Sequence, residues 1–236
     1  AGTRLEQEDY HGADIALGHG LPAELMLRKE ILQPALQQVP QLPAAPPLDG
    51  DLDAWPAEAA DIRTTDANVG THLFFTSQWA GDSDLAARVR LGHDTTHLYI
   101  GIAVKDNLLT AKDALQLKLS PANYKKWLRQ KEPYELSFAF PVPHADREVT
   151  GQGGTGFSCG SIRSTSGYVA EGSIPLAELG LEAGDRIGWV IHLSDDDDTP
   201  ELANDRWARK TIMLIPHHPH FAYWADARTC GELVLE

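Results

Sequence analysis

Alternation of apolar and polar residues dominates the middle of the chain. In the segments 87–91, 97–105 and 114–119, apolar residues recur at every second position. This period of two is typical of β-strands that are buried on one face only. The link at 93–96 is short and polar, so the first two strands are expected to form an antiparallel hairpin. One face of the three strands is predicted to lie in the core: Leu98, Ile100, Ile102, Val104, Leu115, Leu117 and Leu119.

Similar segments recur from residue 48 to the C-terminus, separated by clusters of Gly, Pro and Asp. The further candidate strands are 61–65, 73–77, 136–141, 158–164, 168–174, 187–193, 210–215 and 232–235. The patterns between them are too short for the helices that connect parallel strands. We therefore predict an all-β fold, an antiparallel β-sandwich of immunoglobulin or jelly-roll type.

Residues 1–47 differ from the rest of the chain. The segment 21–32 consists of helix formers with a proline near each end, which predicts a short helix. Four prolines within 40–47 favour an extended, semi-rigid spacer. We place a domain boundary at residue 48, with 48–236 as the sandwich and 1–47 as an N-terminal extension. The extension is either the tail of a preceding domain or a strap lying over the sandwich, and the sequence does not separate the two.

The charge of the chain excludes two classes of partner. The 34 acidic and 20 basic residues give a net charge of −14, which repels phosphate backbones and anionic lipid headgroups. We therefore expect neither a nucleic-acid partner nor a membrane partner. The chain begins without Met, so we expect a processed chain or a fragment of a longer protein.

Few motifs indicate catalysis. A GxGxxG pattern ends at Gly156, but a predicted strand follows it where a nucleotide site needs a helix.

The two cysteines, Cys159 and Cys230, either form a single bridge or stay buried as thiols. Of the six tryptophans, Trp55 and Trp189 lie in strand-like contexts and are predicted to be core residues. Exposed loop tryptophans are the side chains that stack on sugar rings, although they also plug the ends of sandwiches.

Five segments in order resemble a known family. They are PLDGDLDAWPAEA, HDTTHLYIGIAVKDN, DALQLKLSP, GYVAEGSIPLAELGLEAGDRIGWVIHLSDDDD and CGELVLE. Together they are similar to carbohydrate-binding module family 9, in the DOMON-like group of β-sandwiches, from about residue 48 to residue 236. The opening motif of that family is matched by Asp49, Gly50, Asp53 and Trp55, and a central strand by Tyr168, Glu171, Ile174 and Pro175.

The resemblance implies a non-catalytic domain that binds the chain ends of oligo- or polysaccharides. Family members hold a sugar between two tryptophans, and Trp207 stands near one of these positions. The other tryptophan has no counterpart, which leaves Trp79 and Trp224 as candidates for a second aromatic wall. The family's glutamate corresponds to Gln116, whose amide can still donate to and accept from hydroxyl groups, and its arginine corresponds to Ala139 or a neighbour. We expect an extracellular or periplasmic protein in which this domain adjoins other domains of the same parent chain.

Calcium is expected mainly because the family usually binds it. Asp49, Asp51 and Asp53 alternate along the chain, which lets carboxylate oxygens converge on Ca²⁺. The alternative is a solvated acidic loop.

Two other functions remain open at this stage. One is a structural sandwich that packs on a neighbouring domain. The other is haem binding, as in some DOMON-like relatives, for which only Met26 and Met213 could provide a methionine ligand.

Overall fold

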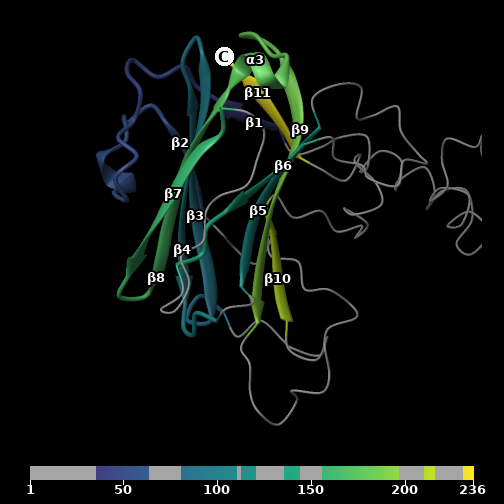
Figure 1. Cartoon of the computed structure of the whole chain (residues 1–236). Helices are drawn as coiled ribbons and strands as arrows, with labels where there is room; N and C mark the ends of the chain where they lie inside the picture. The colour runs from purple at the N-terminus through teal and green to yellow at the C-terminus, as the bar shows by residue number, and fades with distance from the viewer. Residues whose placement is uncertain are drawn as a thin grey trace, which may run out of the picture.

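The computed structural model describes residues 36–63, 81–110, 113–120, 136–143, 156–196, 210–215 and 231–236. In this part of the chain, eleven strands form two sheets that face each other (Figure 1). Every strand pair is antiparallel except β1 with β11. The predicted antiparallel β-sandwich is therefore confirmed.

The two sheets have the following strand orders. Sheet A runs β1 (Leu36–Val39), β11 (Gly231–Leu235), β9 (Arg186–Asp196), β5 (Ala114–Ser120) and β6 (Leu136–Phe140), and β10 (Lys210–Ile215) also pairs with β9. Sheet B runs β2 (Ala60–Arg63), β3 (Leu85–His93), β4 (His97–Asp106), β8 (Gly167–Pro175) and β7 (Ser158–Ser164). The predicted strand at 73–77 and the predicted helix at 21–32 lie outside the described residues.

The core lies between the sheets, where the alternation placed it. Ile100 and Ile102 of β4 are 0% exposed, and Leu117 of β5 on the facing sheet is 1% exposed. Trp189 fills the same core, as predicted. Burial of each such side chain contributes about 1.5–3 kcal/mol, so these alternating positions supply much of the stability of the sandwich.

A tight polar turn joins β3 to β4. The Oδ1 atom of Asp94 accepts hydrogen bonds from the backbone N–H groups of Thr96 (2.6 Å) and His97 (2.8 Å). Its Oδ2 atom accepts a hydrogen bond from the hydroxyl group of Tyr99 (2.6 Å). The predicted hairpin is confirmed, and one aspartate side chain organises its turn.

Residues 36–42, which we call the N-terminal strap, join the two sheets. β1 adds to the edge of sheet A beside β11, and the carbonyl of Val39 accepts a hydrogen bond from the N–H of Glu236 (3.1 Å). The strap then crosses to sheet B, where the N–H of Leu42 donates to the carbonyl of His93 (2.7 Å). The sequence placed these residues in the N-terminal extension, as either the tail of a preceding domain or a strap over the sandwich. In the structure they belong to the sandwich, because their apolar side chains Val39 and Leu42 are buried.

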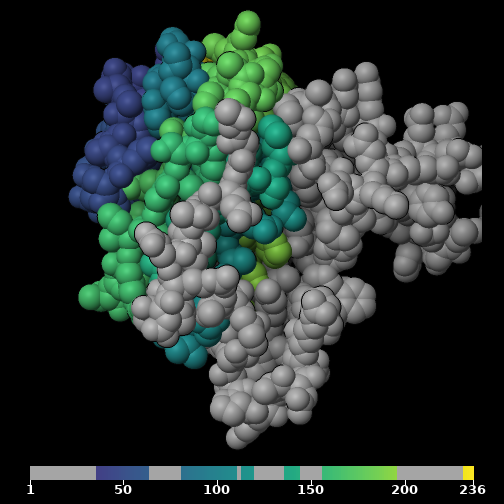
Figure 2. All heavy atoms as spheres, viewed as in Figure 1, coloured from purple at the N-terminus to yellow at the C-terminus, as the bar shows by residue number. Residues whose placement is uncertain are grey.

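Residues 48–59, the covering segment, lie on the outer face of sheet B (Figure 2, purple). Leu52 and Trp55 pack there against Tyr99, and a short 3₁₀ turn, η1 (Leu52–Ala54), brings them to the sheet. Gly101 leaves room for them, since a Cβ atom at this position would lie 2.5 Å from Leu52. Trp55 is therefore buried as predicted, although in a second cluster outside the main core.

A buried carboxylate holds the covering segment in place. Glu171 of β8 is 4% exposed and accepts two hydrogen bonds, from the N–H of Gly50 (2.6 Å) and from the indole Nε1–H of Trp55 (2.7 Å). We call this arrangement the Glu171 clamp. It explains why the opening Gly and Trp motif and the Glu of the central strand occur in one sequence, since they are partners in space.

Helix is scarce in the described part of the chain. Besides η1 there is one short helix, α3 (Leu176–Leu179), which follows β8 and ends at Gly180 with φ of 62°. Among the described residues no helix is long and apolar enough to cross a membrane.

Candidate functional site

Gln116 lies near the middle of β5 on the outward face of sheet A. Its neighbours Leu115 and Leu117 are each 1% exposed and point into the core, so the alternation of the strand turns Gln116 away from the core. Gln116 pairs with Ala139 of β6 on one side and with His192 of β9 on the other. All three residues are half-buried. They form a cross-strand row on one face of the sheet.

This row contains the positions that the family resemblance assigned to sugar recognition. The resemblance assigned Gln116 to the family's glutamate, and Ala139 or a neighbour to its arginine. The register makes Gln116 and Ala139 direct cross-strand neighbours. His192 was missed by the sequence analysis. It falls within the predicted strand 187–193, but only strand pairing shows that it shares a face with Gln116.

The next row along the same face contains a polar side chain without a hydrogen bond. Ser194 of β9 pairs with Ala114 of β5 and is 4% exposed. Its hydroxyl oxygen makes no hydrogen bond with any residue that the structure describes. A buried hydroxyl in this state costs about 1–3 kcal/mol, so such groups usually meet water or a ligand.

The predicted stacking residues cannot be placed on this face. Trp207, Trp79 and Trp224 all lie outside the described residues, so their role remains a prediction. Of the two alternatives for the cysteines, the structure has the thiol form at Cys159 on β7 and not a bridge to Cys230. For haem, Met213 pairs with Leu193 and Met26 is not described, so this alternative is not tested either.

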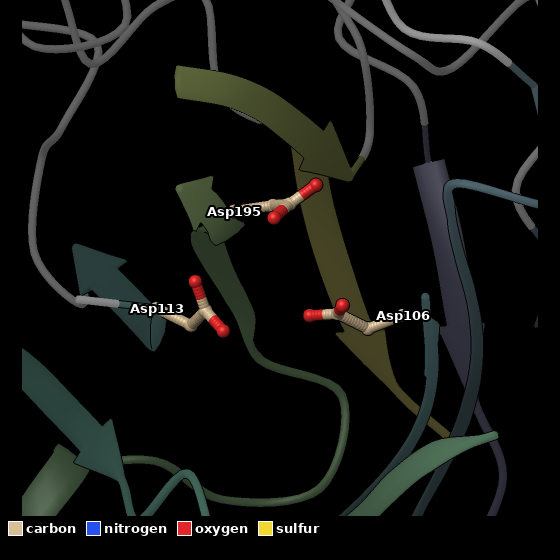
Figure 3. A group of neighbouring side chains, drawn as sticks. All are labelled: Asp106, Asp113 and Asp195. Carbon is tan, nitrogen blue, oxygen red and sulfur yellow. The ribbon is translucent and has the colours of Figure 1, made fainter. Parts of the chain in front are cut away.

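Three carboxylates converge at one end of the sandwich (Figure 3). Asp106 ends β4 of sheet B, whereas Asp113 precedes β5 and Asp195 lies on β9 of sheet A. One oxygen atom of each lies within 4.8 Å of the others, and the three side chains point toward one another. Asp106 and Asp195 are 6% and 3% exposed. Asp113 is half-buried. Three carboxylates this close together and this shielded from water repel one another, which a bound cation relieves.

The loop between β4 and β5 orients two of these carboxylates. Asp106 Oδ1 accepts a hydrogen bond from the N–H of Leu108 (2.7 Å), and Asp113 accepts from the N–H (2.6 Å) and the hydroxyl (3.0 Å) of Thr110. The same charges act on the neighbouring Tyr168. Burial raises the pKa of its phenol well above the usual range, and Asp113, Asp106 and Asp195 raise this pKa further. The end of the core therefore carries a strong negative field.

The structure does not bring together the carboxylates predicted to bind calcium. Asp49 accepts from the N–H of Asp51 (3.2 Å), and Asp51 caps η1 by accepting from the N–H of Asp53 (3.0 Å). Asp53 forms an ion pair with Arg88 (2.6 Å), which lowers the pKa of the carboxyl group. Within the described ranges, Asp106, Asp113 and Asp195 are the one group of three or more acidic, His or Cys side chains close enough to share a metal.

The fold and the site define a class of protein. It is a two-sheet β-sandwich with a polar row on the outward face of one sheet and a carboxylate cluster at one end. Residues 48–236 match the family described as carbohydrate family 9 binding domain-like, and the chain belongs to this family.

Three solved structures have a similar fold. Two are solved structures of a family 9 carbohydrate-binding module from Caldicellulosiruptor kristjanssonii, one in complex with cellotriose and one with glucose. The first is 16% identical with a TM-score of 0.56 and covers 85% of this chain and 93% of that chain. The second is 16% identical with a TM-score of 0.53 and covers 85% of this chain and 96% of that chain.

A third similar structure is a putative carbohydrate-binding protein from Bacteroides uniformis. It is 11% identical with a TM-score of 0.51, and the match covers 86% of this chain and 100% of that chain. At these identities the likeness shows the fold. No match was found among curated proteins.

Proposed function

We propose that this chain is a non-catalytic carbohydrate-binding domain whose sugar site lies on the outward face of sheet A. The observation that carries the proposal is the placement of Gln116. The residue at the family's sugar-binding position lies on this face, half-buried, between Ala139 and His192. The family 9 module that was solved in complex with cellotriose or glucose supports the same ligand class for this domain. Trp207 is our candidate for the stacking surface, with Trp79 or Trp224 as a second wall.

The ligand is a soluble or insoluble polysaccharide outside the cytoplasm. We infer an extracellular or periplasmic protein in which other domains of the parent chain act on the polysaccharide that this domain holds. The membership in a binding-module family supports the non-catalytic role. Incubation with oligosaccharides should release no reducing ends, and fractionation of the source cells should place the parent protein outside the cytoplasm.

Calcium is the cofactor that the carboxylate cluster fits. Ca²⁺ prefers oxygen ligands and takes six to eight of them, and Asp106, Asp113 and Asp195 provide carboxylate oxygens at one point. Because these residues come from both sheets, a bound cation would hold the two sheets together at this end. We therefore place the proposed site here and not at Asp49, Asp51 and Asp53. Titration of the EDTA-treated protein with Ca²⁺ alone in an isothermal calorimeter should show binding. Scanning calorimetry should show that added Ca²⁺ raises the Tm.

Isothermal calorimetry with sugars tests the main proposal. We expect wild-type protein to bind at least one neutral oligosaccharide, and Gln116→Ala to weaken this binding at least fivefold. Lys105→Ala, an exposed change on sheet B, serves as the control and should have no effect. If the wild type binds no sugar in a broad panel, the proposal fails and a structural sandwich that packs on a neighbouring domain takes its place.

A further inference from the structure

We propose that two copies of this chain pair through strand β7 and form a symmetric dimer. β7 (Ser158–Ser164) is the last strand of sheet B, and in the described part of the chain it pairs with a strand on one side only, β8 (Figure 1). The inference does not depend on sugar binding, because the row that contains Gln116 lies on the other sheet.

The hydrogen bonds of the neighbouring strands show which backbone groups of β7 are used within the sheet. The N–H of Asp106 in β4 donates to the carbonyl of Ser166 (2.9 Å), just before Gly167 of β8. In an antiparallel ladder this bond turns the N–H and C=O groups of Gly167 away from β4 and toward β7. Gly167 pairs there with Ser164, so the even-numbered residues of β7 bond to β8.

The odd-numbered residues therefore face the free edge of the sheet. The N–H and C=O groups of Ser161 and Arg163 point away from β8, and within the described ranges no backbone hydrogen bond joins either residue to a third strand. Five of the seven residues of β7 are exposed, so a second strand can reach this edge.

β7 also lacks the features that usually keep an edge strand from pairing. Edge strands are commonly protected by Lys, by Pro or by a bulge that interrupts the ladder. β7 contains no Lys or Pro, and all seven of its residues pair with β8 in an unbroken register. The strand is therefore a template for one more antiparallel strand.

The side chains of β7 indicate that this added strand is a second copy of β7 itself. A two-fold axis through Ser161 pairs the odd-numbered residues of the two copies with one another, and it places Ile162 opposite Gly160 of the partner subunit. Ile162 is 52% exposed, and a Cβ atom at Gly160 would have nothing within 4 Å. A glycine within a strand often marks the close approach of another segment. Each Ile162 thus covers the open space at the other copy's glycine.

The charges near β7 permit this contact even though the net charge of the chain is −14. Residues 151–170 contain no Asp or Glu, so the paired strands bring no carboxylates together. Arg163 is the one charged residue of β7. In the two-fold register the two copies of Arg163 are four residues apart along the sheet, about 13 Å, which exceeds the screening length of about 8 Å at physiological salt.

Sedimentation at increasing protein concentration, with no sugar present, tests the inference. One strand from each copy makes a small interface, so the mass should rise reversibly from that of one chain toward that of two between about 10 µM and 1 mM. Ile162→Lys places two charges in the contact, and Ser161→Pro removes an N–H that faces the partner. Each should weaken association at least tenfold. Leu36→Lys is the matched control, since it changes a 56% exposed residue on the edge strand β1 of sheet A, and it should dimerise as the wild type does.

A disulfide cross-link tests the register. In a background with Cys159→Ser and Cys230→Ser, Ser161→Cys puts one thiol of each copy at the two-fold axis. Residues in such a hydrogen-bonded pair have Cα atoms about 5.5 Å apart, which suits a disulfide. Mild oxidation should give at least tenfold more covalent dimer than it gives for Arg163→Cys in the same background, whose thiols are about 13 Å apart.

Thermal denaturation at low protein concentration separates association from folding. Ile162→Lys and Ser161→Pro change an exposed side chain and an outward N–H, so their Tm should lie within about 2 °C of the wild type. A much lower Tm for Ser161→Pro would mean that this N–H is already used within the chain, which would overturn the inference.

Two further results would also overturn it. One is a wild type that stays monomeric at about 1 mM, the upper end of the expected range. The other is a dimer that Leu36→Lys disrupts and Ile162→Lys leaves intact, because the interface then lies on another edge. Both results leave the proposed sugar binding untouched, since calorimetry with sugars tests that function separately.

Discussion

Glu171→Gln tests whether the covering segment is held by one buried carboxylate. In the wild type, Glu171 accepts hydrogen bonds from the N–H of Gly50 at 2.6 Å and from the indole N–H of Trp55 at 2.7 Å. Glutamine has nearly the same shape but only one accepting oxygen. Its NH₂ group therefore faces one of the two donors, so one hydrogen bond is lost and a buried N–H is left without an acceptor.

The magnitude follows from these contacts. A hydrogen bond to a charged acceptor contributes about 1.5–3 kcal/mol, and an unsatisfied buried donor costs a similar amount, so we expect Glu171→Gln to lower the free energy of unfolding by about 2–3 kcal/mol. In a domain of this size, 1 kcal/mol corresponds to about 2–4 °C, so the Tm should fall by about 4–12 °C. Glu171→Ala removes both bonds and leaves a cavity, and it should cost about 4–5 kcal/mol.

Urea and thermal denaturation measure this change. Glu182→Gln, at an exposed position after α3, makes the same chemical substitution and should shift the Tm by less than about 1 °C. Trp55→Phe removes the other end of one bond. The double variant should lose less free energy of unfolding than the sum of the two single variants, because the two residues share a hydrogen bond. Equal effects of Glu171→Gln and Glu182→Gln, or full additivity with Trp55→Phe, would refute the clamp.

Four further changes have definite expected outcomes. Gly92→Ala should lower the free energy of unfolding by about 1–3 kcal/mol, because the added Cβ atom would lie 2.5 Å from Leu42 and displace the N-terminal strap. Combining it with Leu42→Ala should restore part of this free energy in urea denaturation. No recovery in the double variant would contradict the packing. Burial disfavours the charged form of Asp94, but hydrogen bonds from Tyr99, Thr96 and His97 outweigh it and lower the pKa to about 2. Since this pKa is depressed from 3.8, the carboxylate stabilises the fold above about pH 4, and this contribution is lost as the pH falls toward 2. When the free energy of unfolding is measured against pH, the wild type should lose this contribution in acid and Asp94→Asn should not. Identical pH dependence of the two proteins would show that Asp94 makes no such contribution. Asp113→Asn should weaken calcium binding at least tenfold in titration calorimetry. Without calcium, its Tm should equal or exceed that of the wild type, because one of three mutually repelling charges is gone. If calcium raises the Tm of this variant as much as that of the wild type, the site is wrong. Trp207→Ala should abolish sugar binding without a change in Tm, and unaltered affinity would remove this residue from the site.

The sequence by itself determined the strands and much of the core. Alternation in 97–105 and 114–119 is a local property, since successive side chains of an extended chain point to opposite faces whatever the strand pairs with. The polar link before His97 predicted the hairpin for a similar reason, because a short aspartate-containing turn forms its own hydrogen bonds. The position of Gln116 within its strand also followed from this alternation, as did its outward direction.

Only the tertiary structure decided which residues became neighbours. His192 joins Gln116, and Asp195 joins Asp113, because β5 and β9 pair in one particular register. Asp106 joins these carboxylates because sheet B packs on sheet A. Residues 40–47 were expected to be a spacer because their four prolines favour extended chain. Yet extended chain that begins in this way also packs on the sandwich when its apolar side chains, such as Leu42, find a core. Pairings of this kind depend on the summed free energy of contacts between distant segments. A single sequence records the local preference of each segment but not the partner that completes it.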